Sequence, residues 1–197
     1  MNREKLAAAF FAGVAMLGFA ASAGAVDGTI EINQAKVMAH GGFPYVISTA
    51  NTSYRLTGSL TVSSTTADAI DVSANNVTID LNGFSITGPG TPSGSGIAGL
   101  DANLTVENGT VIAFGSGTGV ATGFNGIVRN MRAISNGVGI QAASGSLISG
   151  STINSNSIGI YCTSQCGFLG NSLVGDTTYI TAAVASMGNN ICNSAPC

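Results

Sequence analysis

The sequence predicts an all-β fold, a parallel β-helix of about seven coils with a short helix near its N-terminal end. Two features of composition point away from a helical or α/β protein: it has 28 Gly and no Trp, and only 8% of its residues are charged. Apolar residues recur in short segments separated by Gly, Asn, Ser and Thr, which is typical of strands and turns. The second half also repeats every twenty residues or so, which indicates stacked units with a continuous core.

Residues 1–25 are expected to be a signal peptide. Arg3 and Lys5 precede an apolar run over residues 6–21, and Ala23-Gly24-Ala25 has the small-x-small pattern of a cleavage site. The run is short for a membrane span and leads directly into polar sequence. We therefore expect an exported protein, periplasmic, at the cell surface or extracellular, without a stable membrane span after cleavage. A single-pass anchor is the alternative.

The predicted mature chain is mildly acidic. Eight acidic residues remain after the signal peptide, against four cationic residues: Lys36, Arg55, Arg129 and Arg132. This balance does not favour nucleic acid as a partner. Intrinsic disorder is excluded because Val, Ile and Leu recur at regular spacing.

All four cysteines lie in the last quarter of the chain, at Cys162, Cys166, Cys192 and Cys197. An even number in an exported chain predicts two disulfides, with three possible pairings. The local pairs Cys162–Cys166 and Cys192–Cys197 are favoured because each closes a turn without long-range register. A zinc site is the alternative, but the spacings are not C-x2-C and no His lies nearby. We expect no metal and no cofactor.

Residues 26–42 are expected to form an N-terminal capping segment. The stretch Thr29–His40 has apolar residues at helical spacing and ends at Gly41-Gly42, which predicts a helix. Such a helix can cover the open end of an elongated β-structure. His40, the only His, is interpreted as a helix C-terminal residue, with a catalytic base as the alternative.

Residues 43–197 are expected to form the β-helix. The predicted early strands are Tyr45–Ser48, Tyr54–Val62, Ala69–Val72, Val77–Leu81 and Phe84–Thr87. Within them Val77, Ile79 and Leu81 or Phe84 are core positions, and Asn82-Gly83 is a corner. Gly88–Ser95 has no periodicity and is expected to be a protruding loop.

The repeat is clearest in the later half, where several columns keep a step of twenty residues. One column places Val120, Ile140, Ile160 and Ile180 in register. Two others place Ile127, Leu147, Gly167 and Met187, and Val128, Ile148, Phe168 and Gly188. Corners are expected at Asn130, Gly150, Gly170 and Asn190, and at Asn136, Asn156 and Asp176.

The segments Tyr54-Arg55-Leu56-Thr57-Gly58 and Asn76-Val77-Thr78-Ile79-Asp80-Leu81-Asn82-Gly83-Phe84 resemble secreted right-handed parallel β-helix proteins of the pectin-lyase-like superfamily. With Ile32-Asn33-Gln34-Ala35-Lys36, they are similar to a bacterial group of small exported β-helix proteins that generally lack an assigned function. The resemblance implies coil geometry rather than chemistry. For many superfamily members it implies acidic polysaccharide substrates.

The catalytic residue motifs that such enzymes use are missing from this chain. Paired aspartates with Gly-His-Gly and Arg-x-Lys do not occur, nor does Asp-Pro-His-Asp. A Lys and Arg pair on one coil face is excluded because Lys36 is the only Lys of the mature chain. The eight acids are spread too widely for an obvious calcium site.

One charged set remains as a candidate site. If the coils align with one extra residue, Leu81, bulged out of the earlier coil, then Asp80, Glu107 and Arg129 form an outward stripe on consecutive strands. Strands about 4.8 Å apart bring such side chains into contact. In the functional interpretation Asp80 or Glu107 is an acid or base, and Arg129 and Arg132 bind a sugar carboxylate.

Each of these features also has a structural interpretation. The stripe is then a solvated charge ladder that contributes less than about 1 kcal/mol per pair. Asn82, Asn108 and Asn130 are interpreted as stacked amides or left-handed corner residues rather than as ligands.

We therefore expect an exported, non-catalytic β-helix scaffold or surface protein that binds polysaccharide or another cell-surface component along one sheet. The alternative is a small carbohydrate-active enzyme, a polysaccharide lyase, epimerase or hydrolase, that acts on acidic glycans. The oligomeric state does not follow from the sequence.

Overall fold

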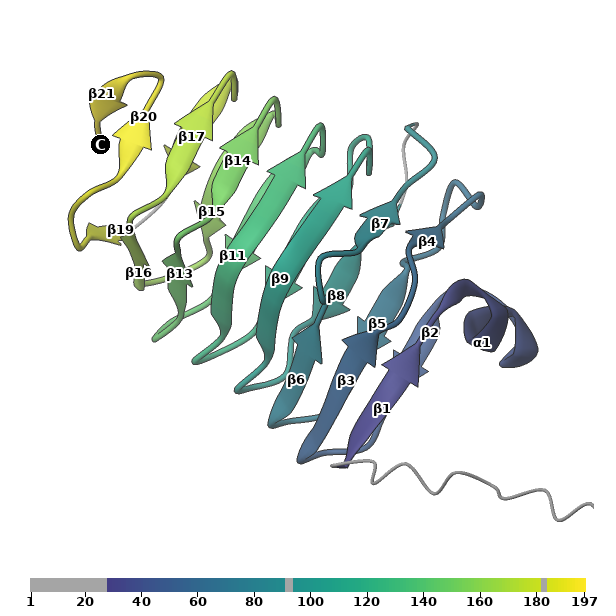
Figure 1. Cartoon of the computed structure of the whole chain (residues 1–197). Helices are drawn as coiled ribbons and strands as arrows, with labels where there is room; N and C mark the ends of the chain where they lie inside the picture. The colour runs from purple at the N-terminus through teal and green to yellow at the C-terminus, as the bar shows by residue number, and fades with distance from the viewer. Residues whose placement is uncertain (1–27, 91–93, 182–183) are drawn as a thin grey trace, which may run out of the picture.

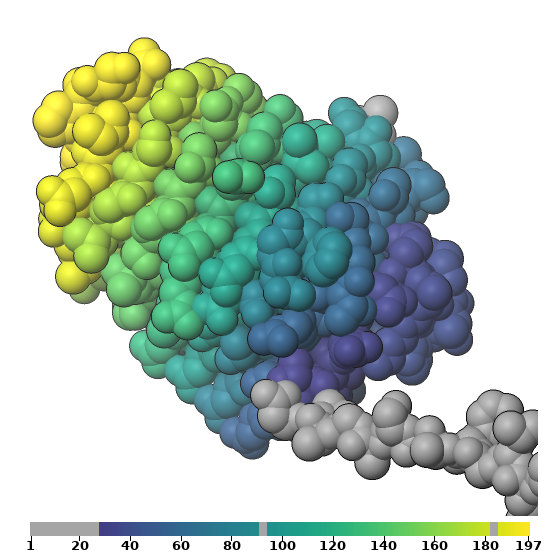
Figure 2. Space-filling model, viewed as in Figure 1, coloured from purple at the N-terminus to yellow at the C-terminus, as the bar shows by residue number. Residues whose placement is uncertain are grey.

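The chain forms an all-β parallel solenoid. We describe it from a computed structural model over residues 28–90, 94–181 and 184–197. The coils stack along one axis, with the N-terminal strands at one end and the C-terminus at the other (Figures 1 and 2). The predicted signal peptide lies outside the described residues, as do residues 91–93 of the predicted loop. In the part of the chain that is described, no helix is long and apolar enough to cross a membrane.

One wall of the solenoid is a parallel sheet of seven strands, one from each coil. Its strands follow the order of the chain, so each coil adds one strand to the edge left by the coil before it. They are β2 (Tyr45–Ile47), β5 (Ile70–Val72), β8 (Ile97–Gly99), β10 (Thr118–Thr122), β12 (Val138–Ala142), β15 (Ile158–Cys162) and β18 (Thr178–Thr181).

The other sheet bends around the solenoid and supplies two further walls (Figure 1). The first wall contains β1 (Thr29–Ile32), β3 (Thr52–Leu56), β6 (Val77–Asp80), β13 (Leu147–Ser149), β16 (Cys166–Leu169) and β19 (Val184–Ser186). The second contains β4 (Leu60–Thr61), β7 (Ser85–Thr87), β14 (Thr152–Asn154), β17 (Ser172–Val174), β20 (Ile191–Cys192) and the antiparallel β21 (Ala195–Pro196). The long strands β9 (Thr105–Ile112) and β11 (Ile127–Ile134) run through both walls.

The core is a continuous apolar column inside the coils. Because side chains alternate along a strand, every second residue points inward, and these inward residues are mostly Val, Ile and Leu. The predicted core positions Val77, Ile79 and Leu81 are fully buried, while Phe84 is only partly buried. The alternation that predicted the strands therefore also predicted what they bury.

Asparagine residues in the left-handed region turn the chain at several corners. The predicted corner residues Asn82, Asn108 and Asn130 have φ of 50°, 60° and 54°. Asn tolerates this region better than most residues because its short polar side chain bonds locally. The prediction of left-handed corner residues is confirmed for all three. The Asn130 amide also stacks on Asn108, donating to its Oδ1, whereas the Asn82 amide donates to the Leu56 carbonyl.

Most of the predicted repeat columns are confirmed by the strand register. Val120 pairs with Ile140, Ile140 with Ile160, and Ile160 with Ile180. The last coil is an exception, because Gly167 pairs with Ala185 and Phe168 with Ser186. This coil is two residues shorter than its neighbours, so the predicted placements of Met187 and Gly188 in these columns are wrong.

The shortened coil also moves one predicted corner. Gly170 donates its N–H to the carbonyl of Gly188, which takes the corner position with a φ of 103°. Asn190, which the period placed there, is instead buried beside Asn171. Asn136, Asn156 and Asp176 do stack at the other corner, as the period predicted.

The helix is shorter than predicted. Residues Thr29–Ile32 form strand β1, which pairs with β3, and only α1 (Gln34–Ala39) is helical. The prediction failed here because the edge of β3 offers hydrogen-bond partners to an extended Thr-Ile-Glu-Ile segment, which local periodicity does not reveal. Asn33 caps the helix start and His40 its end, as expected for His40. Val37 reaches the core, while the capping role itself stays a prediction.

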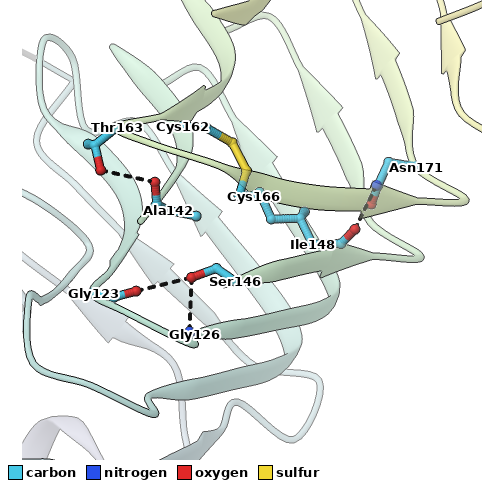
Figure 3. The surroundings of a disulfide bond; sticks show 9 residues. All are labelled: Gly123, Gly126, Ala142, Ser146, Ile148, Cys162, Thr163, Cys166 and Asn171. Atoms are coloured by element: carbon cyan, nitrogen blue, oxygen red, sulfur yellow. Dashed lines mark hydrogen bonds between the residues drawn. A yellow bond between two sulfur atoms is a disulfide. The ribbon is translucent and has the colours of Figure 1, made fainter. Parts of the chain in front are cut away.

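The two disulfides are the local ones that the sequence favoured. Cys162 bonds to Cys166 across the turn between β15 and β16 (Figure 3), and Cys192 bonds to Cys197 around the terminal hairpin. The Cα atoms of the pairs are 6.0 Å and 5.5 Å apart. Both crosslinks therefore hold the C-terminal coils and leave the N-terminal coils without one.

Candidate functional site

Five charged side chains follow one another across the outer face of the first wall. Glu31 on β1 lies beside Arg55 on β3, which lies beside Asp80 on β6. Asp80 in turn pairs with Glu107 on β9, and Glu107 with Arg129 on β11. The structure thus brings the predicted stripe of Asp80, Glu107 and Arg129 together and extends it. We call these five residues the charge ladder.

Asp80 is held by three donors. Arg55 Nε lies 3.3 Å from its Oδ2, while its Oδ1 accepts the Asn82 N–H at 2.8 Å and the Asn108 amide at 3.1 Å. Its side chain is only 18% exposed. Asp80 therefore ties together the corners of two coils, which is a structural task.

Glu107 forms an ion pair with Arg129, whose Nε donates to the carboxylate. Asp80 and Glu107 lie on neighbouring strands, but each pairs with a different arginine. Sequence reasoning missed Arg55 as the partner of Asp80, because the first coils are longer than twenty residues and do not follow the period. Apolar and polar residues alternate in Tyr54–Leu56 as they do in Val77–Asp80, and this shared pattern is the sequence signal that aligns Arg55 with Asp80.

The corner after Asp80 differs from the predicted bulge. Four residues separate Asp80 from Ser85, whereas two separate the matching residues Glu107 and Thr110. The earlier coil therefore has two extra residues rather than one. Leu81 is fully buried and does not bulge outward, because its side chain fills the space beside Gly109, where an added Cβ would lie 2.2 Å from Leu81 Cβ.

A hollow of about 270 Å³ opens at this corner. We call it the corner hollow. It spans three coils, from the extra turn of the earlier coil to β11, and its lining is Gly83, Asn108, Gly109, Thr110, Asn130 and Arg132. Sequence reasoning named Arg132 and the two asparagines but not the hollow, which depends on how far the extra turn projects.

The two predicted ligand-binding arginines have different surroundings. Arg129 is paired with Glu107 and does not line the corner hollow. Arg132 lines it, is exposed, and has no acidic partner among the described residues. Its strand neighbours on either side are Thr110 and Thr152, which leave its charge uncompensated. Of the two, Arg132 is the one free to meet an anion.

The amides of the corner hollow are held in place by the charge ladder. The Asn108 amide donates to Asp80, and the Asn130 amide donates to the Asn108 oxygen at 3.3 Å. These two hydrogen bonds orient the side chains of Asn108 and Asn130 before any ligand binds. A guanidinium beside oriented amides suits a sugar with a carboxylate and hydroxyl groups.

Asp80 is poorly arranged for acid–base catalysis. A general acid or base must exchange a proton with the reacting group, so one oxygen has to be free to face it. Both oxygens of Asp80 accept hydrogen bonds or face a cation, whereas Glu107 pairs with Arg129 through Oε2 alone. No group of three His, Cys, Asp or Glu side chains in the described ranges is placed to hold a metal ion.

A second, smaller hollow of about 180 Å³ lies near the N-terminal end, lined by His40, Pro44, Tyr45 and Val46. The His40 and Tyr45 rings meet edge to face, with centroids 5.6 Å apart. No acid among the described residues lines it, so within that part of the chain His40 has no carboxylate there to orient a catalytic imidazole.

Comparison of the chain with family models, curated proteins and solved structures gives no match.

Proposed function

We propose that this protein is an exported, non-catalytic β-helix protein that binds an acidic glycan, with a uronate carboxylate placed against Arg132 in the corner hollow. The observation that carries the proposal is the difference between the two arginines: Arg129 is neutralised by Glu107, whereas Arg132 faces the hollow without an acidic partner in the described chain. The local disulfides support an oxidising compartment. The sequence resemblance supports membership of the pectin-lyase-like superfamily.

The size of the corner hollow sets the scale of the contact. At about 270 Å³ it falls below the range of pockets that enclose drug-sized ligands. It suits one sugar unit of a polymer whose neighbouring units lie on the open outer face. Affinity per site is then modest, and repeated units of the polymer supply avidity.

Calorimetric titration with an oligogalacturonate, and with a neutral oligosaccharide of equal length, tests the proposal. We expect the acidic oligomer to bind and the neutral one to bind at least tenfold more weakly. Arg132→Gln should weaken binding by about 10- to 100-fold, the range for a lost charge-assisted hydrogen bond. Lys36→Gln on α1 removes the same charge far from the hollow and should leave the affinity unchanged.

The enzymatic alternative gives a different result in the same samples. Incubation with uronic-acid polymers, with and without calcium, should yield neither absorbance from unsaturated ends nor new reducing ends. Turnover that is lost in Glu107→Gln would replace the binding proposal with a lyase or hydrolase. Equal binding by the wild-type protein and Arg132→Gln would also overturn it.

A further inference from the structure

Two ladders of buried polar side chains run along the inside of the later coils. In the first, the backbone N–H and side-chain amide of Asn136 both donate to Asn156 Oδ1, and those of Asn156 both donate to Asp176 Oδ1. In the second, Asn171 donates to Asn190 in the same way. All five residues are at most 5% exposed.

Each asparagine of these ladders uses its second amide hydrogen for a strand carbonyl. Asn136 donates to Val111 and Asn156 to Ala133, while Asn171 donates to Ile148 (Figure 3) and Asn190 to Phe168. These bonds tie each corner to a wall strand of the preceding coil. The inner ladders therefore hold neighbouring coils together as well as turning the chain.

Asp176 is the one acid in these ladders. Asp176 Oδ2 occupies the position that the amide nitrogen Nδ2 occupies in Asn136 and Asn156. The distances from three equivalent glycines show this. A Cβ added to Gly119 or Gly139 would lie 2.9 Å or 3.0 Å from the Nδ2 of Asn136 or Asn156, and one added to Gly159 would lie 2.8 Å from Asp176 Oδ2. Asp176 Oδ2 is buried and has no hydrogen-bond partner.

The register identifies the carbonyl that Asp176 should meet. Val111 pairs with Ala133 and Ala133 with Ile153, so the Ile153 carbonyl follows those of Val111 and Ala133 in the series. A carboxylate oxygen and a carbonyl oxygen repel each other, whereas a protonated carboxyl can donate. The geometry points to Asp176 as a neutral acid that donates a hydrogen bond to the Ile153 carbonyl. This hydrogen bond, which we call the latch, holds the last coils together and is lost when Asp176 ionises.

The surroundings of Asp176 support this assignment. Burial raises the pKa of the Asp176 carboxyl, and outweighs the two Asn156 donors that lower it. From Ala133 to Cys197 the sequence has no other acid and no base, and the cysteines are bonded. On the neighbouring strands β15 and β18, the titratable side chains are those of Tyr161 and Tyr179.

The direction of the effect follows from the raised pKa. An acid that binds its proton more tightly in the folded state adds stability that is fully present below its unfolded pKa, about 4. That stability falls as pH rises through the folded pKa and is absent above it. Because the ends of a solenoid open locally, the loss should be confined to the last coils.

Hydrogen exchange of the Thr177 and Thr178 amides, which donate to Asn156 and Ser157, measures this opening. After correction for intrinsic exchange, the opening constant in the wild-type protein should rise up to about tenfold per pH unit across the window between the two pKa values. Asp176→Asn restores the amide rung and should remove the dependence. Asn190→Asp should introduce the same dependence at Ile191, whose N–H donates to Asn171.

The carboxyl carbon shift of Asp176 in the wild-type protein gives an independent readout if a variant fails to fold. It should titrate above the ordinary pKa of aspartate. Titration at or below that value, or a pH dependence that persists in Asp176→Asn, would overturn the latch. The latch does not depend on the corner hollow, so binding of uronate neither supports nor contradicts it.

Discussion

Arg55 and Asp80 form an ion pair between the second and third strands of the first wall, with Nε 3.3 Å from Oδ2. The pair matters less for its charge than for what else the carboxylate does, because the other oxygen accepts from Asn82 and Asn108. Asp80 thus anchors the hydrogen-bonded amides of Asn108 and Asn130, which line the corner hollow.

Substitutions in this pair should have unequal effects on stability. Arg55→Ala should lower the free energy of unfolding by less than about 1 kcal/mol, since the arginine is half-exposed and the ion pair is screened. Asp80→Ala also removes two hydrogen bonds at the corners and should cost about 1–2 kcal/mol. Urea denaturation measures both. Equal losses would mean that Asp80 acts only through Arg55.

Gly109 should be sensitive to a single added methyl group. A Cβ at this position would lie 2.2 Å from Leu81 Cβ and 2.8 Å from the Phe84 carbonyl oxygen, both held by the extra turn. Gly109→Ala should therefore lower the free energy of unfolding by about 3 kcal/mol, at the upper end of overpacking costs.

Gly58→Ala is the matched control for this experiment. The nearest atom to its added Cβ, Asn33 Cβ, is 3.6 Å away, and its φ is not positive. A neutral or slightly stabilising result is expected, with a gain of up to about 1 kcal/mol. If both variants unfold at the wild-type urea concentration, the turn is not packed against Gly109 as described.

Removal of the Cys162–Cys166 disulfide should loosen the C-terminal coils selectively. The double variant Cys162→Ser with Cys166→Ser loses a crosslink of about 2 kcal/mol in the chain-entropy model. Hydrogen exchange should accelerate in β15 and β16, while β3 and β6 keep their protection. Uniform acceleration along the chain would show that the solenoid opens as one unit.

The fold was predictable because its physical cause is periodic. Val120, Ile140, Ile160 and Ile180 fall on one inward column since coils of equal length repeat the same environment. The prediction failed where a coil changes length, as at Gly167 and Ala185, and where a strand edge decides the conformation, as at Thr29–Ile32. Neither condition is visible in a local window of sequence.

The candidate site was predictable only in part. Asp80, Glu107 and Arg129 were placed together because they occupy equivalent outward positions on neighbouring strands. The corner hollow was not predicted, since it results from two extra residues whose turn projects beyond the following coils. The pairing of Arg129, which leaves Arg132 as the free arginine at the hollow, likewise depends on side-chain geometry.

The most direct test of the proposed function is to map where a uronate binds, by following backbone amides and the arginine Nε signals in ¹⁵N NMR spectra during titration with an oligogalacturonate. The account predicts shifts centred on Thr110, Asn130 and the Arg132 side chain, with the Arg55 side chain unchanged. Shifts centred on Arg55 and Asp80, or an unperturbed Arg132 at saturating ligand, would contradict it.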